Sequence, residues 1–193
     1  MEMNKDIDIK LIRSNRKTIA IEITSIGEVI VRAPRHVPEA EIQQFVDTKS
    51  DWLAKHLQKF EKSKDTLQTE GKLTPNEINR LMKLAKQVIP AKVAYYARLM
   101  GVTYGRITIR KQKTRWGSCS REGNLNFNVL LMLAPPEVLD YIVVHELSHR
   151  VEMNHSVKFW AQVEKVLPEY KVAYKWLKEN GSGLIMRMYG DDL

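Results

Sequence analysis

Short strands are the first elements that the hydrophobic pattern predicts, within residues 6–34. Isoleucines alternate with other residues over 19–24, a turn follows at 25–28, and a second apolar run occupies 29–31. Such alternation is typical of half-buried strands, and a turn between two such runs indicates a hairpin. The beginning of the chain therefore predicts a β-hairpin.

A helical period replaces this alternation after the strands. Apolar residues recur at steps of three and four from Glu39 to about Glu61, which predicts one amphipathic helix. The polar stretch 62–72, KSKDTLQTEGK, is expected to be a linker. We therefore expect an N-terminal lobe of hairpin and helix over residues 1–73. A C-terminal unit over residues 74–193 should pack with it as one compact molecule.

The C-terminal unit begins with a strong helix signal. Thr74 and Glu77 form a capping-box pattern with proline between them, and the helix should end at Gly101. Residues 106–110 and 124–129 then alternate as strands. Three further helices are expected to begin at Pro135–Pro136, at Ser156 and near residue 169, the last of them ending at Gly181. Strands and helices in this order indicate an α+β fold.

The helix that follows Pro136 differs from the others because apolar residues surround its axis almost completely. A helix that is apolar on all sides is buried. Two histidines and a glutamate on this helix need partners, since unpaired polar groups are costly to bury. Its apolar residues are Val138, Leu139, Tyr141, Ile142, Val143, Val144 and Leu147.

Residues 145–149 of this helix are His-Glu-Leu-Ser-His, which matches the H-E-x-x-H pattern. Positions i and i+4 lie on one face a turn apart, so His145 and His149 can bind one metal ion. Glu146 lies one step around the helix, close enough to contact a metal-bound water without being a ligand. Zinc at such a site acidifies the water, and Glu146 takes the water's proton and later passes it to a leaving amine.

His155 follows where the helix should yield to a turn, and it supplies a third imidazole. Three histidines with one open position form the catalytic type of zinc site, so we expect one Zn²⁺ per chain. Two other interpretations concern the same residues. The histidines could be core residues that bond backbone carbonyls, or they could form a structural zinc site, which would need a fourth protein ligand.

Composition narrows the class of protein. With 44% hydrophobic and 28% charged residues, the 193-residue chain is typical of a globular protein. Its single cysteine, Cys119, excludes an internal disulfide framework, and we expect it to be a small buried residue rather than a nucleophile. The N-terminus has no signal-peptide pattern, and the longest apolar run, 129–134, is too short to span a membrane. We therefore expect a cytoplasmic protein.

Charge is distributed unevenly along the chain. The net charge is +8, yet residues 78–121 hold eleven basic residues and no acidic one. Such a stretch indicates an anionic partner, either nucleic acid or a nucleotide. The alternative is a solvated basic face that aids solubility.

Several motifs together resemble the YgjP-like metallopeptidase domain, a relative of the SprT-like proteases. They are the H-E-x-x-H pentapeptide, Asn154-His155-Ser156 with Phe159-Trp160, the upstream Arg115-Trp116-Gly117-Ser118-Cys119, and the N-terminal segment from Arg16 to Pro34. The resemblance implies a zincin-like fold in which His145, His149 and His155 bind zinc and Glu146 is the general base. The single cysteine excludes the Cys-rich zinc ribbon of some SprT-like proteins.

The zincin resemblance also assigns Leu125–Leu131 as an edge strand that pairs with extended substrate. Asn126 and Asn128 would then face the substrate, or they would simply occupy the solvated face of that strand. Arg115, within the upstream motif, is a candidate for stabilising charge in the transition state, or for a contact that orders the turn at Trp116.

Two carboxylates, Glu152 and Glu164, are candidates to orient the ligand imidazoles, although a surface role is the simpler interpretation of each. The leading hypothesis for the whole chain is a zinc metallopeptidase. One alternative is a metal-dependent nucleotide pyrophosphatase or phosphohydrolase that uses the same site. Another is a protease that acts on proteins bound to nucleic acid.

Overall fold

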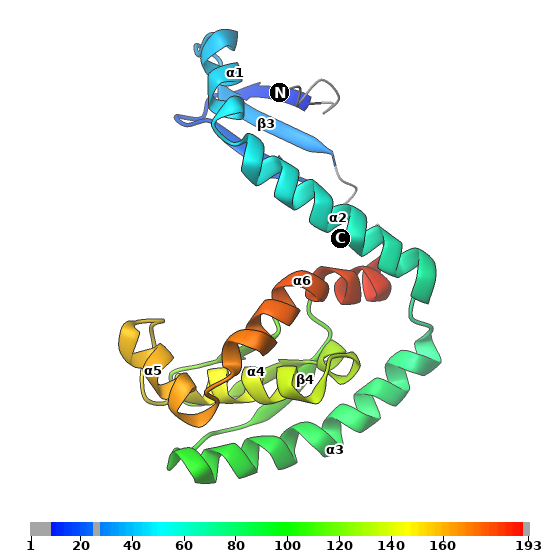
Figure 1. Cartoon of the computed structure of the whole chain (residues 1–193), viewed down its shortest axis with the longest axis vertical. Coiled ribbons are helices and arrows are strands. Elements are labelled where there is room, and N and C mark those ends of the chain that lie inside the picture. Colours follow the sequence, from blue (N-terminus) through cyan, green and yellow to red (C-terminus); the bar gives the residue numbers. More distant parts are fainter. Residues whose placement is uncertain (1–8, 25–27, 191–193) are drawn as a thin grey trace.

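The computed structural model describes residues 9–24 and 28–190, and it has the expected α+β fold (Figure 1). Helices outnumber the strands, which form two small sheets. In chain order the elements are β1 (Ile9–Ser14), β2 (Ala20–Ile23), β3 (Val29–Pro34), α1 (Glu39–Asp47), α2 (Ser50–Glu70), α3 (Pro75–Met100), β4 (Ile107–Arg110), β5 (Gly117–Cys119), β6 (Leu125–Asn128), the 3-10 helix η1 (Val129–Leu133), α4 (Pro136–Ser148), α5 (Val157–Val166) and α6 (Tyr170–Tyr189).

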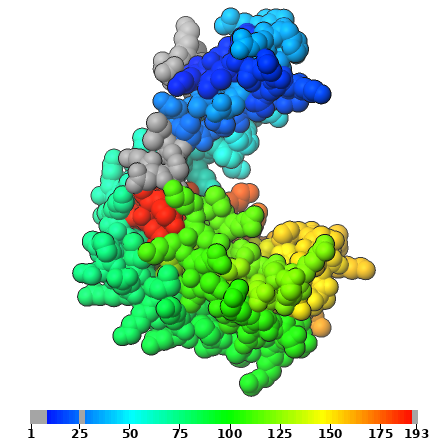
Figure 2. Space-filling model, turned by 180° about the vertical axis from the view of Figure 1, so that it is seen from behind, coloured from blue at the N-terminus to red at the C-terminus, as the bar shows by residue number. Residues whose placement is uncertain are grey.

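The N-terminal lobe contains the expected hairpin. Strands β2 and β3 pair antiparallel, and β1 adds to the other side of β3 in parallel, giving the order β1-β3-β2. The hairpin turn lies largely outside the described residues. A small core joins this sheet to α1 and to the start of α2, and its centre is formed by Val29, Val31, Ile42, Val46 and Leu53. The N-terminal lobe projects from the rest of the molecule (Figure 2).

The predicted linker over 62–72 is wrong, because most of it is helical. The chain breaks once at Thr48 and Lys49, and α2 then continues to Glu70. Its polar residues are held by α6: the Ser63 hydroxyl donates to Ser182 Oγ at 2.8 Å. The sequence around Ser63 has no strong amphipathic pattern because small and polar residues also make the contact with α6: Gly183 lies against Thr66, and Arg187 forms an ion pair with Glu70.

The C-terminal unit has a second sheet with the order β4-β6-β5. The capping box that begins α3 is confirmed, since Thr74 and Glu77 bond each other's backbone N–H groups. Gly101 ends this helix in the left-handed conformation, with φ of 66°. A large core lies between α3, the sheet, α4 and α6, and α4 is buried on nearly all sides as predicted.

Helix α6 is longer than predicted, because it continues through Gly181 to Tyr189. Its glycines serve close packing rather than termination. A Cβ on Gly181 would lie 2.9 Å from the Trp116 ring, and one on Gly183 would lie 3.1 Å from Thr66 of α2. Helix α6 therefore lies between α2 and α4 and connects the N-terminal lobe to the C-terminal unit (Figure 1).

None of the helices among the described residues is both long and apolar enough to cross a membrane.

Candidate metal centre

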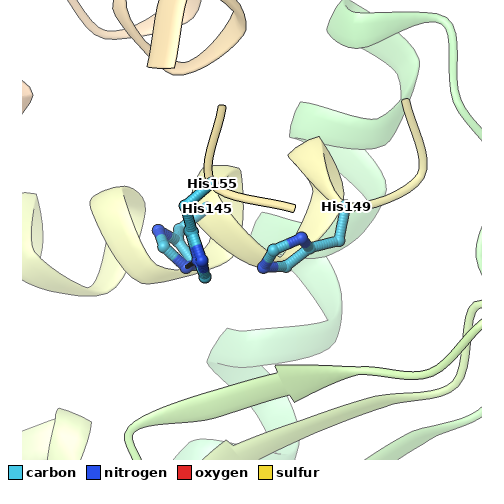
Figure 3. Close-up of side chains that lie close together, drawn as sticks. All are labelled: His145, His149 and His155. Carbon is cyan, nitrogen blue, oxygen red and sulfur yellow. Dashed lines mark hydrogen bonds between the residues drawn. The ribbon is translucent and has the colours of Figure 1, made fainter. Parts of the chain in front are cut away.

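Three histidines converge at the end of α4. His145 lies in its last turn, His149 is the C-cap residue, and His155 belongs to the turn before α5. The Nε2 atoms of His145 and His155 are 3.1 Å apart, and one ring nitrogen from each histidine lies within 4.8 Å of the others. Figure 3 shows the three rings gathered in one place.

Local structure after α4 explains how His155 returns to the other two histidines. The chain turns immediately after His149, with backbone hydrogen bonds from Arg150, Val151 and Glu152 to the last turn of α4. The side chain of Asn154 then accepts a hydrogen bond from the Ser156 N–H, and Ser156 caps α5 as predicted. This short loop folds back over the helix end, so that the third imidazole faces the pair from α4.

The donor set fits a zinc ion. Burial, and then the neighbouring rings of His149 and His155, lower the pKa of His145 to about 3. Burial also lowers the pKa of His149. Neutral imidazole is the form that binds metal, and three such nitrogens with an open side suit catalytic zinc.

The other ring nitrogens of the two α4 histidines have partners that orient the rings. His149 Nδ1 lies 3.2 Å from the backbone carbonyl of Glu152, and Tyr141 Oη lies 3.5 Å from His145 Nδ1. The Glu152 contact is made by its carbonyl, not by its carboxylate. Glu164 instead forms an exposed ion pair with Lys171. Tyr141 was missed by sequence reasoning, which assigned it only to the core.

Glu146 is buried beside the histidines and only 5% of its surface is exposed. Burial raises the pKa of Glu146 to about 8, and the positive charge of Arg115 opposes this shift. The carboxylate lies against strand β5: a Cβ on Gly117 would be 2.5 Å from Glu146 Oε1. Gly117 is therefore the residue that leaves room for this carboxylate, and sequence reasoning missed that role.

A cavity of about 480 Å³ adjoins Glu146 and His145. Arg115 and Trp116 line it from the segment before β5, and Tyr141 lines it from α4. Arg115 thus lies near the candidate general base, as its predicted role requires. Cys119 lies in β5 nearby, and burial raises the pKa of its thiol, so the thiol is poorly suited to act as a nucleophile.

The prediction that Leu125–Leu131 forms an edge strand is wrong. Strand β6 ends at Asn128 and lies in the centre of its sheet, and β5 is the edge strand nearest α4. Asn128 is fully buried: its amide group donates to two backbone carbonyls, and its oxygen caps η1. Asn126 donates to Ser118 Oγ across the sheet. The edge-strand argument for substrate binding by these asparagines therefore fails.

Comparison with known proteins finds a matching family model and similar solved structures, two of which are metallopeptidase zymogens. The model of the YgjP-like metallopeptidase domain matches residues 17–82 and 70–180. The metallopeptidase zymogen abylysin of Pyrococcus abyssi is 23% identical with a TM-score of 0.43, covering 47% of this chain and 93% of that chain. The metallopeptidase zymogen jannalysin of Methanocaldococcus jannaschii is 22% identical with a TM-score of 0.41, covering 46% and 95%. No curated protein matches the chain.

Proposed function

The chain belongs to the YgjP-like metallopeptidase domain family, and on that premise we propose that it hydrolyses peptide bonds at one zinc ion per chain. His145, His149 and His155 would hold the metal. The observation that carries the proposal is their convergence beside the buried carboxylate of Glu146. The family is the one expected from the motifs at residues 115–119 and 145–149.

Glu146 has the position and the environment of a general base. When bound, zinc supplies Lewis acidity that lowers the pKa of water and polarises a carbonyl. Burial raises the pKa of Glu146, which increases the proton affinity of its carboxylate, and the positive charge of a bound zinc would favour the ionised form. The ionised carboxylate can then accept a proton from the attacking water, and the resulting carboxylic acid can return it to the leaving amine. The guanidinium of Arg115 adds positive charge near the atoms where negative charge develops.

Strand β5 is our candidate for the substrate-pairing role that the zincin resemblance assigned to Leu125–Leu131. It is the edge strand next to α4, so its outer backbone groups face away from β6. An extended peptide can add to such an edge by main-chain hydrogen bonds, with specificity coming from adjacent pockets. This arrangement would place the peptide across Glu146 and the three histidines.

The basic stretch 78–121 adds no comparable support for a nucleic-acid partner. Its residue Lys92 forms an ion pair with Asp140 of α4, with 2.6 Å between Nζ and Oδ1. The nucleotide alternative uses the same metal site, so a substrate comparison separates it from peptide hydrolysis.

The test measures metal content and cleavage in wild type and Glu146→Gln. We expect one zinc per chain in both proteins, with cleavage of a random peptide library falling about 10²- to 10⁴-fold in the variant. Nucleoside triphosphates serve as the second substrate set. Peptide cleavage that persists without zinc, or nucleotide hydrolysis without peptide cleavage, would contradict the proposal.

A further inference from the structure

The cavity beside Glu146 gathers three cationic side chains from three separate elements. Lys59 comes from α2, Arg115 from the segment before β5, and Lys178 from α6. None of the three takes part in an ion pair within the described ranges 9–24 and 28–190. Within those ranges Glu146 is the only carboxylate in the cavity lining. The N-terminal lobe thus contributes one residue, Lys59, to the lining of the candidate active site.

The charge of one of these lysines acts on the other. Burial, and then the charge of Lys178, lowers the pKa of Lys59. Lys178 also lies over the Tyr174 ring, with its Nζ 5.8 Å from the ring centroid. Like charges held at one cleft create a positive potential that attracts anions. An anionic group in the cavity would relieve their mutual repulsion.

The remainder of the lining is largely apolar. The lining includes Trp116, Ile142, Leu177 and Ile185, which are more buried than the exposed cations Arg115 and Lys178. The volume of about 480 Å³ lies in the range of small-ligand pockets. The lining therefore suits an occupant with a short apolar stem and a negatively charged end.

We propose that this cavity binds a carboxylate of the substrate, on an acidic side chain or at the C-terminus, and so directs the enzyme to acidic peptides. The choice of a carboxylate rests on the proposed peptidase function, because peptides carry carboxylates and no other common anion. Lysine and arginine bind carboxylates by charge-assisted hydrogen bonds, which are stronger than neutral ones.

The experiment compares matched peptides with the zinc-loaded full chain. Each pair differs by one group, either Glu against Gln within the sequence or a free C-terminal acid against its amide, and the two kinds of pair separate the two sources of carboxylate. We expect the acidic member of at least one kind of pair to have a kcat/KM about tenfold higher. Equal rates for the members of both kinds of pair would overturn the proposal.

Variants of the cavity lysines test whether the preference for acidic peptides arises in the cavity. Lys59→Met and Lys178→Met remove one charge each, and the acid-to-neutral ratio should fall towards one in both. Lys62→Met and Lys175→Met are the matched controls, since these exposed lysines lie on the same helices outside the cavity lining. A ratio that falls equally in the controls would assign the preference to net charge, and would overturn the role of the cavity.

A binding measurement keeps this inference separate from the proposed function. Calorimetry of the same peptide pairs with Glu146→Gln needs no turnover. We expect Glu146→Gln to bind the acidic peptide more tightly than its neutral match, and the double variant Glu146→Gln/Lys59→Met to lose this difference. That result would support the role of the cavity even if no peptide is cleaved. In that case only the proposed function would fail. Binding of nucleoside triphosphates that depends on Lys59, without binding of acidic peptides, would overturn the carboxylate assignment.

Discussion

The N-terminal lobe and the C-terminal unit contain sheets of the same topology, but the three histidines and Glu146 all lie in the C-terminal unit. In both sheets the first strand pairs parallel with the third, and the second pairs antiparallel with the third. The helices that cover them differ. Helix α1 buries two residues, Ile42 and Val46, whereas α4 is buried over most of its length, including Glu146.

The surroundings of the carboxylates differ in the same way. In the N-terminal lobe the carboxylate of Glu22 pairs with Arg32 at the surface, where both side chains are well exposed. In the C-terminal unit Glu146 is buried without a neutralising ion pair among the described residues, and its pKa is raised to about 8. The sheet topology is a scaffold, and reactivity follows from enclosing polar groups in apolar surroundings.

The largest expected effect is the loss of zinc and peptidase activity when a histidine of the C-terminal unit, rather than one of the N-terminal lobe, is replaced. His149→Ala should lose both bound zinc and peptidase activity, because two imidazoles remain where three are needed. His56→Ala is the control: this exposed residue of α2 lies near the Trp52 carbonyl and away from the triad. Elemental analysis after dialysis measures the metal. Equal zinc content in both variants would show that His149 is no more important for metal binding than His56, and would contradict a metal site in the C-terminal unit.

Core truncations test whether the two halves are separate in stability. Leu53 and Leu147 are both fully buried, one in each core. Replacing either with alanine should lower the free energy of unfolding of its own half by about 2–5 kcal/mol. Hydrogen exchange should speed up around β1–β3 in Leu53→Ala and around β4–β6 in Leu147→Ala. Faster exchange over the whole chain in both variants would show one cooperative unit instead.

Gly117→Ala tests the close approach of β5 to α4. The added methyl group would lie 2.5 Å from Glu146 Oε1 and 2.8 Å from its Cγ, so the carboxylate must move. Displacement of a catalytic group by about 1 Å can lower the rate about 100-fold. We expect this fall in kcat while the zinc content stays at the wild-type level. An unchanged kcat would mean that the position of Glu146 does not depend on β5.

The smallest expected effect concerns the connection between the halves. Ser63→Ala removes the hydrogen bond to Ser182 and should cost about 1 kcal/mol of stability in urea unfolding. Thr69→Ala is the control, since Thr69 bonds only to backbone carbonyls of its own helix. Equal losses of stability in Ser63→Ala and Thr69→Ala would show that the serine pair contributes nothing to the contact between α2 and α6.

The sequence patterns that correctly predicted structure are those formed by residues close together in the chain. The hairpin, the capping box at Thr74 and the cap at Ser156 each depend on residues a few positions apart, and the structure has all three. The errors arose where a distant partner decided the outcome. The segment around Ser63 looked like a linker because its partner lies in α6, and Gly181 looked like a helix end because the sequence does not show that Trp116 packs against it.

The sequence by itself determined the spacing of His145 and His149 on one buried helix, because helical geometry relates positions four apart without further information. It also placed His155 and Glu146 among the candidates. Only the tertiary structure decided which strand lies at the edge beside them, β5 rather than β6, and which cations meet there. Strand order and the approach of Lys59 to Lys178 depend on the packing of distant segments, which no local pattern of residues encodes.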